Sequence, residues 1–145
     1  MLSGGVCENG CILNLKEALK MTKQPTNAVV WTEIPVSDLK KAVAFYTDVF
    51  GYSLTIDESG PNPMAVFPDK DTMGACGHLY PGKPASNGQG PTAHLAIAGK
   101  VEDAAARCTK AGGKVLSPVI TIPPGRYVYA QDPDGNSLGL FEAAS

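Results

Sequence analysis

The side chains best suited to chemistry are few in this chain. It has two histidines, His78 and His94, and a carboxylate, Glu33, inside an apolar run. Imidazole and carboxylate groups bind divalent metals and transfer protons. Glu33 stands two residues after Trp31, so in a strand the two side chains share a face. An aromatic ring beside a carboxylate suits an aromatic or cationic small molecule.

The four cysteines carry a weaker signal. Cys7 and Cys11 are separated by three residues, whereas zinc knuckles and redox motifs use two, and no second pair follows. A metal-binding or disulfide-bonded pair stays open beside reduced thiols, which are the ordinary state in a cytosolic protein. Cys76 and Cys108 stand among apolar residues and fit small core side chains.

Composition favours one globular domain. The chain has 145 residues, of which 43% are hydrophobic and 18% charged, which is enough for one core and too little charge for a disordered chain. A net charge of −2 and scattered lysines and arginines argue against a nucleic-acid partner. No apolar run is long enough to cross a membrane and no signal-peptide pattern is present, so we expect a cytoplasmic protein.

Residues 1–24 differ from the rest. Their apolar residues, which include Leu15 and Leu19, suit one short amphipathic helix. We expect an N-terminal appendage that docks a partner or caps a dimer, unless the protein begins at Met21. A single domain is then expected over residues 25–145.

After this segment the pattern becomes regular. Residues 28–36 are rich in β-branched and aromatic types and predict a strand. Ser37 or Asp38 then caps a helix over 39–50, and Gly51 ends it. The apolar face of this helix is expected to comprise Leu39, Ala42, Val43, Tyr46 and Phe50. Three strands follow, over residues 52–57, 64–69 and 74–80.

A linker over 81–91, rich in Pro, Gly, Ser and Asn, leads to a second half. A strand is expected over 93–99 and a helix over 101–111. Further strands are predicted over residues 112–120, 125–131 and 137–143, and the sequence DPDGN forms a tight turn between the last two.

The two halves align without a gap at an offset that places Asp38 on Lys100. Each half is therefore expected to be a βαβββ module, one over 28–82 and one over 91–142. An internal duplication explains the shared pattern better than two unrelated halves do.

A tandem βαβββ repeat of this length resembles the vicinal-oxygen-chelate superfamily, which includes glyoxalases, bleomycin-resistance proteins and extradiol dioxygenases. EIPVSDLKKAVAFYTDVFGYSL is similar to the first strand and helix of that superfamily, and AGGKVLSPVITIPPGRYVYAQDPDGNSLGLFE to its closing half. The resemblance covers residues 28–142 and implies an α+β fold in which cupped, mixed sheets form a barrel-like pocket. It says less about function, because one fold hosts many chemistries.

The resemblance also implies where a metal would bind. Members of the family hold a divalent metal through a His or Gln on the first strand of each half and a Glu on the last, and the metal acts as a Lewis acid. Counted from Asp38 and from the DPDGN turn, these positions fall on Trp31 and Gly139, and by the offset on Ala93 and Gly77. Since none of the four can ligate a metal, we expect no cofactor.

A displaced divalent-metal site is the alternative, with Glu33, His78 and His94 as ligands. A shift of one residue along a strand turns a side chain to the opposite face. His94 is therefore expected to point away from the pocket, under a helix, unless its strand bulges. The competing interpretation is that both histidines are partly buried and make ordinary hydrogen bonds.

Several side chains are expected to line the pocket. The expected ligand-binding residues are Trp31, Glu33, Phe67, Arg126, Tyr127 and Tyr129. Glu33 is the candidate general base, because burial favours the protonated form of a carboxyl group and suits it to proton transfer. A salt bridge to Arg126 or a lysine is the competing role of Glu33. The aromatic residues can equally belong to the core or to a dimer interface.

Two functions stay open at this point. A metal-free small-molecule-binding protein, similar to the drug-sequestering members of the family, is favoured by the missing ligands and by Trp31. The alternative is a metal-dependent or Glu33-dependent lyase or isomerase resembling glyoxalase I, or a dioxygenase-like enzyme. A third idea is an interaction module that uses residues 1–24. Exposed sheet edges also predict an isologous homodimer.

Overall fold

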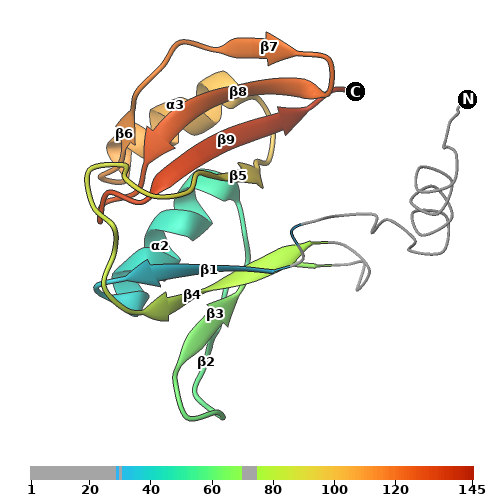
Figure 1. Cartoon of the computed structure of the whole chain (residues 1–145). Coiled ribbons are helices and arrows are strands. Elements are labelled where there is room, and N and C mark those ends of the chain that lie inside the picture. Colours follow the sequence, from blue (N-terminus) through green and yellow to red (C-terminus); the bar gives the residue numbers. More distant parts are fainter. Residues whose placement is uncertain (1–28, 30, 70–74) are drawn as a thin grey trace, which may run out of the picture.

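The computed structural model describes residue 29 and the ranges 31–69 and 75–145 (Figure 1). Within these residues the first half of the chain builds a four-stranded sheet and the second half a five-stranded sheet. The predicted appendage of residues 1–24 lies outside the described residues. Neither described helix is long and apolar enough to cross a membrane.

The first half contains β1 (Trp31–Val36), α2 (Leu39–Phe50), β2 (Ile56–Asp57), β3 (Met64–Val66) and β4 (Cys76–Pro81). Its strand order is β1-β4-β3-β2. β1 runs parallel to β4, and the other pairs are antiparallel. This arrangement makes β1 an edge strand of the sheet.

The second half contains β5 (Ala93–Ala96), α3 (Val101–Lys110), β6 (Lys114–Val115), β7 (Ile120–Ile122), β8 (Gly125–Gln131) and β9 (Ser137–Ala143). Its strand order is β5-β9-β8-β6, and β7 also pairs with β8. The single strand expected over 112–120 is divided into β6 and β7. Pro118 lies between the two pieces and has no N–H for a strand pair.

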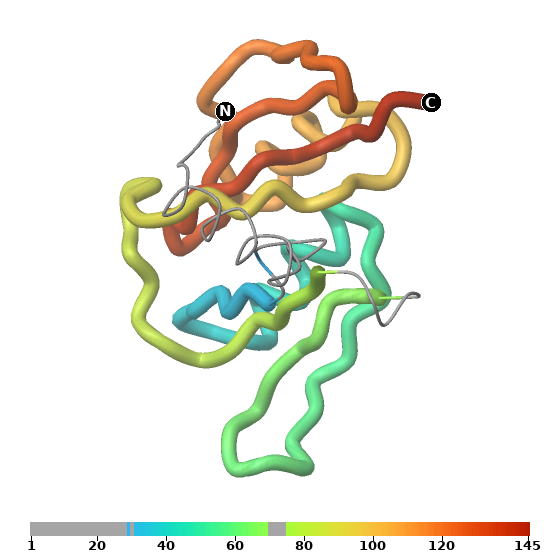
Figure 2. The backbone as a smooth tube through the Cα atoms, turned by 45° about the vertical axis from the view of Figure 1, so that its right-hand side comes forward, coloured from blue at the N-terminus to red at the C-terminus, as the bar shows by residue number. Residues whose placement is uncertain are grey.

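The two halves repeat one topology, in which the first and last strands are parallel neighbours joined through a helix. The predicted α+β fold of tandem βαβββ modules is confirmed. The two sheets stay separate and do not close into a barrel (Figure 1). In Figure 2 the linker passes along one side of the molecule from the end of β4 to the start of β5. The duplication itself stays a prediction.

Helix α2 begins and ends where the sequence predicts. The Asp38 carboxylate accepts a hydrogen bond from the Lys41 N–H at 3.1 Å, and Gly51 ends the helix in the left-handed conformation, with φ 79°. Phe45 and Val49 are buried in addition to most of the expected face. The buried stripe is wider than expected because α2 packs against α3 as well as against its own sheet.

A buried carboxylate joins the two halves. Asp132, in the DPDGN turn, is 3% exposed. It accepts hydrogen bonds from the Tyr46 hydroxyl at 2.9 Å and from the Asn136 amide at 2.8 Å, and two backbone N–H groups of the turn add to these. The Asn136 amide also donates to the Pro35 carbonyl at 2.8 Å. One turn of the second half is thereby fixed to α2 and to β1.

Further bonds cross the seam between the halves near the helix ends. The Arg107 guanidinium donates to the Val49 carbonyl at 2.9 Å, and the Tyr52 hydroxyl donates to the Ala96 carbonyl at 2.6 Å. The Ala98 N–H donates to the Phe50 carbonyl at 3.2 Å. The last turn of α2 is thus tied to the chain that follows β5.

We predict that Tyr46→Phe lowers the free energy of unfolding at pH 7 by about 2 kcal/mol, as for other hydrogen bonds to a charged group. Burial already raises the pKa of Asp132, and the variant removes one donor that stabilises its ionised form. Urea unfolding measures the change. Tyr80→Phe is the control, because no described residue hydrogen-bonds the Tyr80 hydroxyl. Equal effects of the two variants would show that the hydrogen bond from Tyr46 to Asp132 does not stabilise the fold.

Candidate functional site

Each sheet has one face covered by a helix and one face with no described helix over it, which we call the open face. On the covered faces the strands present core residues, namely Ile34, Val36, Leu79, Val128, Leu138 and Leu140. Side chains alternate along a strand, so the residues between these lie on the open faces. The open-face residues with functional groups are Trp31, Glu33, His78 and Tyr80 in the first half and His94, Tyr127, Tyr129 and Phe141 in the second.

On the open face of the first sheet, Trp31 lies over His78. Its indole N–H donates a hydrogen bond to His78 Nδ1 at 3.0 Å, and the ring centroids are 5.7 Å apart. Trp31 is 46% exposed, whereas His78 is 8% exposed. The ring of Tyr80 lies 5.9 Å from that of His78. Part of this half therefore presents a surface of aromatic rings.

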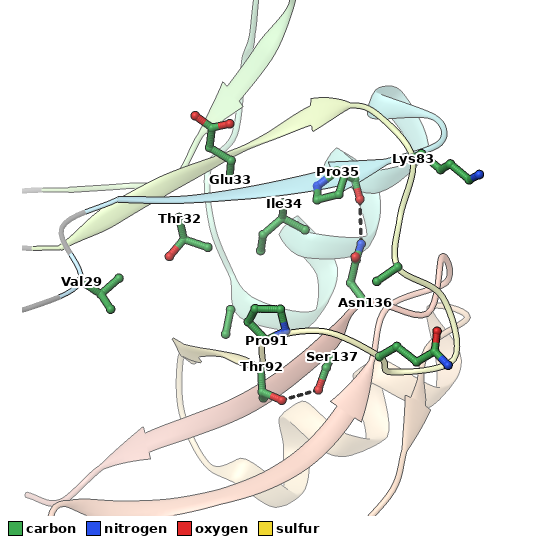
Figure 3. A pocket seen from close by; sticks show the side chains of 13 residues that line it. Val29, Thr32, Glu33, Ile34, Pro35, Lys83, Pro91, Thr92, Asn136 and Ser137 are labelled. Atoms are coloured by element: carbon green, nitrogen blue, oxygen red, sulfur yellow. Dashed lines mark hydrogen bonds between the residues drawn. The ribbon is translucent and has the colours of Figure 1, made fainter.

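Glu33 lies on the same open face, as its spacing from Trp31 predicts. It pairs with His78 across β1 and β4, and it is exposed. Figure 3 shows its carboxylate pointing away from the space between the halves. Its candidacy as a general base required burial, and the structure does not provide it. The competing salt bridge from Glu33 to Arg126 does not form, because Arg126 pairs with Glu102 and Glu142.

The open face of the second sheet carries a second aromatic group around His94. The His94 ring lies 4.9 Å from Tyr127 and 5.8 Å from Tyr129, and the two tyrosine rings are 5.2 Å apart. The parallel register pairs His94 with Gly139, where an added Cβ would overlap the imidazole. Partial burial here lowers the pKa of His94. Because Gly139 has no side chain, the His94 imidazole can lie directly above it.

Side-chain orientation departs from the gapless alignment of the two halves. The alignment sets the neighbours Thr32 and Gly77 on the neighbours His94 and Gly139. Thr32 nevertheless lies on the opposite face of β1 from Trp31 and Glu33, whereas His94 lies on the open face of β5. Two residues connect β1 to α2 and four connect β5 to α3, and among these four Gly99 has a left-handed φ of 79°.

This difference in orientation overturns part of the predicted register of the metal-ligand positions. Ala93 packs against the core, and a Cβ added at Gly77 would overlap the Thr32 carbonyl oxygen, so neither position faces the open side. Their neighbours, His94 and His78, lie there instead. The prediction that His94 points away, under a helix, is wrong, because Ala93 and not His94 takes the core side of β5.

The fallback metal ligands, Glu33, His78 and His94, all lie on the open faces. However, nowhere in the ranges that the structure describes do three His, Cys, Asp or Glu side chains gather closely enough to hold a metal ion. Glu33 and His78 lie on one sheet and His94 on the other. His78 also uses Nδ1 to accept the Trp31 N–H. Within one chain, these residues do not fit a divalent metal.

Two residues expected in the pocket lie off the open faces. Phe67 is 6% exposed and packs in the core, with the Tyr52 ring 5.8 Å away, and it also lines a cavity between the halves. Arg126 lies on the opposite face of β8 from Tyr127 and Tyr129. It forms salt bridges with Glu102 at 2.8 Å and with Glu142 at 2.6 Å. The Glu142 carboxylate in turn accepts the first N–H of α3, at Val101. Arg126 therefore secures the start of α3.

Tyr80 and Phe141 are open-face residues that the sequence reasoning did not name. The signal for Phe141 was available, because the tight turn at 132–136 pairs Gln131 with Ser137 and so sets Tyr127 opposite Phe141. Tyr80 stands two residues after His78 and shares its face by simple alternation.

Two cavities lie along the seam where the edge strands β1 and β5 approach each other. The larger, of about 530 Å³, is lined from the first half by Tyr52, Phe67 and Cys76 and from the second by His94 and Ala96, among others. The smaller, of about 410 Å³, lies beneath the linker (Figure 3). Both volumes fall within the range of small-molecule sites.

Comparison with known proteins agrees with this architecture. Residues 28–140 match the model of the Glyoxalase/Bleomycin resistance protein/Dioxygenase superfamily. The chain belongs to this superfamily. A glyoxylase-like domain-containing protein from Didymella fabae is 30% identical over 115 residues, which cover 74% of this chain and 88% of that protein.

Solved structures of superfamily proteins share the fold. A glyoxalase/bleomycin resistance protein from Albidiferax ferrireducens T118 superimposes with a TM-score of 0.63 at 18% identity, covering 81% of this chain and all of that one (100%). TnmS3, an antibiotic binding protein from Streptomyces sp. CB03234, is 27% identical, with a TM-score of 0.55 and coverage of 84% and 100%. The predicted family is therefore confirmed.

We predict that Gly139→Ala displaces His94 from the tyrosines, because the new Cβ would overlap its ring. The His94 ring protons should lose the ring-current shift that Tyr127 and Tyr129 impose, as measured by NMR. Gly60→Ala is the control, since nothing lies within 4 Å of a Cβ at that position. Unchanged His94 resonances in Gly139→Ala would refute this packing.

Proposed function

We propose that this protein binds a planar aromatic small molecule on the open faces of its sheets and does not transform it. The observation that carries the proposal is the aromatic surface that each open face leaves exposed. Trp31 is 46% and Tyr129 is 38% exposed. Large rings give most stabilisation when they are covered, so grouped and exposed rings indicate a surface that a ligand covers.

Two further observations support a binding role. The cavity of about 530 Å³ reaches the aromatic group through His94 and offers room for a molecule of drug size. The similar protein TnmS3 is described as an antibiotic binding protein, which supports a binding role for this fold. The proposed ligand is therefore a small molecule with at least one planar ring.

The charge on the first open face favours a cationic group in that ligand. Glu33 lies on the same face as the exposed Trp31 ring, and among the described residues no cation pairs with its carboxylate. A positive charge held near an aromatic face and a carboxylate is attracted by both.

The enzymatic alternative has less support. Glu33 is exposed, so the environment that would make it a general base is lacking. The possible metal ligands lie on two sheets and do not converge within the described chain. A homodimer and a cytoplasmic location stay predictions.

We predict that proflavine, a planar cation, quenches Trp31 fluorescence with a saturable curve. The chain has one tryptophan, so the signal reports on the first open face alone. Glu33→Gln should raise the Kd about threefold, the size expected for an exposed charge pair. Glu58→Gln, which changes an exposed carboxylate outside this face, should leave the Kd unchanged.

A strictly linear quenching curve would mean collisional contact only and would remove the proposed site. Equal effects of Glu33→Gln and Glu58→Gln would show that the probe responds to net charge and not to this face. Cyclohexylammonium, a cation without an aromatic ring, should compete poorly, because it cannot stack on the exposed rings.

A further inference from the structure

The cavity of about 410 Å³ is separate from the open faces. Its walls come from β1, from the linker and from the starts of β5 and β9. The side chains of Thr32 and Ile34 enter the cavity from β1. They lie on the opposite face of this strand from Trp31 and Glu33. Figure 3 shows both side chains pointing toward Pro91 and Thr92. A molecule in this cavity would lie on the other side of β1 from the Trp31 ring.

The walls of this cavity are largely apolar and carry no inward charge. Apolar groups are contributed mainly by Val29, Ile34, Pro35, Ala85, Pro91 and Ala93. Two charged residues border the cavity, but Figure 3 shows the Glu33 carboxylate and the Lys83 ammonium group pointing away from it. An ion would lose its hydration here without gaining a partner, so the cavity suits a neutral molecule.

Hydroxyl groups and the side-chain amide of Gln89 supply most of the polar part of the walls. The Thr92 and Ser137 hydroxyls are 2.5 Å apart and share one hydrogen bond, so one of their two hydrogens stays available. The Thr32 hydroxyl has no partner among the described residues and lines the same space. The Asn136 amide has both hydrogens engaged, by Pro35 and Asp132. The available donors are therefore the hydroxyls and the side-chain amide of Gln89.

The roof of the cavity is a strained segment held in place at both ends. Ser86 and Asn87 have left-handed φ values of 64° and 53°, which residues other than glycine adopt at a cost. The Gly82 N–H donates to the Val36 carbonyl at 2.9 Å, and the Gly88 N–H donates to the Gly135 carbonyl at 2.6 Å. The linker is therefore held over the cavity and does not fill it.

We infer that this cavity is a second binding site, for a neutral, mostly apolar small molecule that carries a carbonyl or a similar acceptor. The acceptor takes hydrogen bonds from the Thr32 hydroxyl and from the Thr92–Ser137 pair. The apolar body of the molecule packs against Ile34, Pro35 and Pro91 and fills the space between them. This site goes beyond the proposed function, because it uses neither Trp31 nor the aromatic open faces.

The probe for the test is prodan, a neutral naphthalene ketone whose emission moves to shorter wavelength in apolar surroundings. We expect saturable binding with a blue shift. Ala85→Phe fills the cavity from its roof and should raise the Kd at least tenfold. Ser137→Ala removes one hydroxyl and should raise the Kd about fivefold, the loss of one hydrogen bond. Neither residue lines the larger cavity.

Matched variants separate this site from others. Ala44→Phe places the same ring on an exposed position of α2, and Ser59→Ala removes an exposed hydroxyl, so both should bind prodan as the wild type does. Trp31→Leu should also leave the Kd unchanged. The inference is overturned by a wild-type protein that gives no saturable shift, or by an Ala85→Phe variant that binds normally. Loss of binding in Trp31→Leu alone would place the probe on the open face and would support only the proposed function.

Discussion

The arrangement of this molecule depends on one buried carboxylate. A charge taken out of water must be matched by hydrogen bonds, and Asp132 obtains them from Tyr46 on α2 and from its own turn. Asn136 extends the same network to Pro35 on β1. The turn also sets the register of β8 and β9, so one interaction positions both the second aromatic face and the wall of the smaller cavity.

The two halves keep a common topology but present different side chains on their open faces. Glu33 is paired with His78 in the first half, and His94 with Gly139 in the second. In the first half an indole covers the imidazole, and in the second the imidazole rests above a glycine, against two tyrosines. Both arrangements present surfaces on which an aromatic ring can stack, and neither brings a set of metal-ligating side chains together. Binding is therefore the function best supported.

Local features of the fold could be predicted from the sequence, whereas features that depend on distant contacts could not. The bounds of α2, β8 and β9 follow from caps and alternation, and the shared face of Tyr127 and Tyr129 follows in the same way. The predicted face of His94 was wrong because the gapless alignment does not preserve side-chain orientation: it sets Trp31, on the open face of β1, onto Ala93, on the core side of β5. The partners of Arg126 and the cavity beneath the linker depend on contacts between segments far apart in the chain, which spacing alone does not encode.

The most direct test of the metal-free account is a titration of chelator-treated protein with Ni²⁺, Zn²⁺, Mn²⁺, Fe²⁺ and Mg²⁺, followed by thermal unfolding. A metal that binds the folded state must raise the Tm in a saturable way. The account predicts no saturable rise with any of the five ions. A rise with one of them that is lost in both His78→Ala and His94→Ala would contradict it and would show that two copies of the chain bring these ligands together.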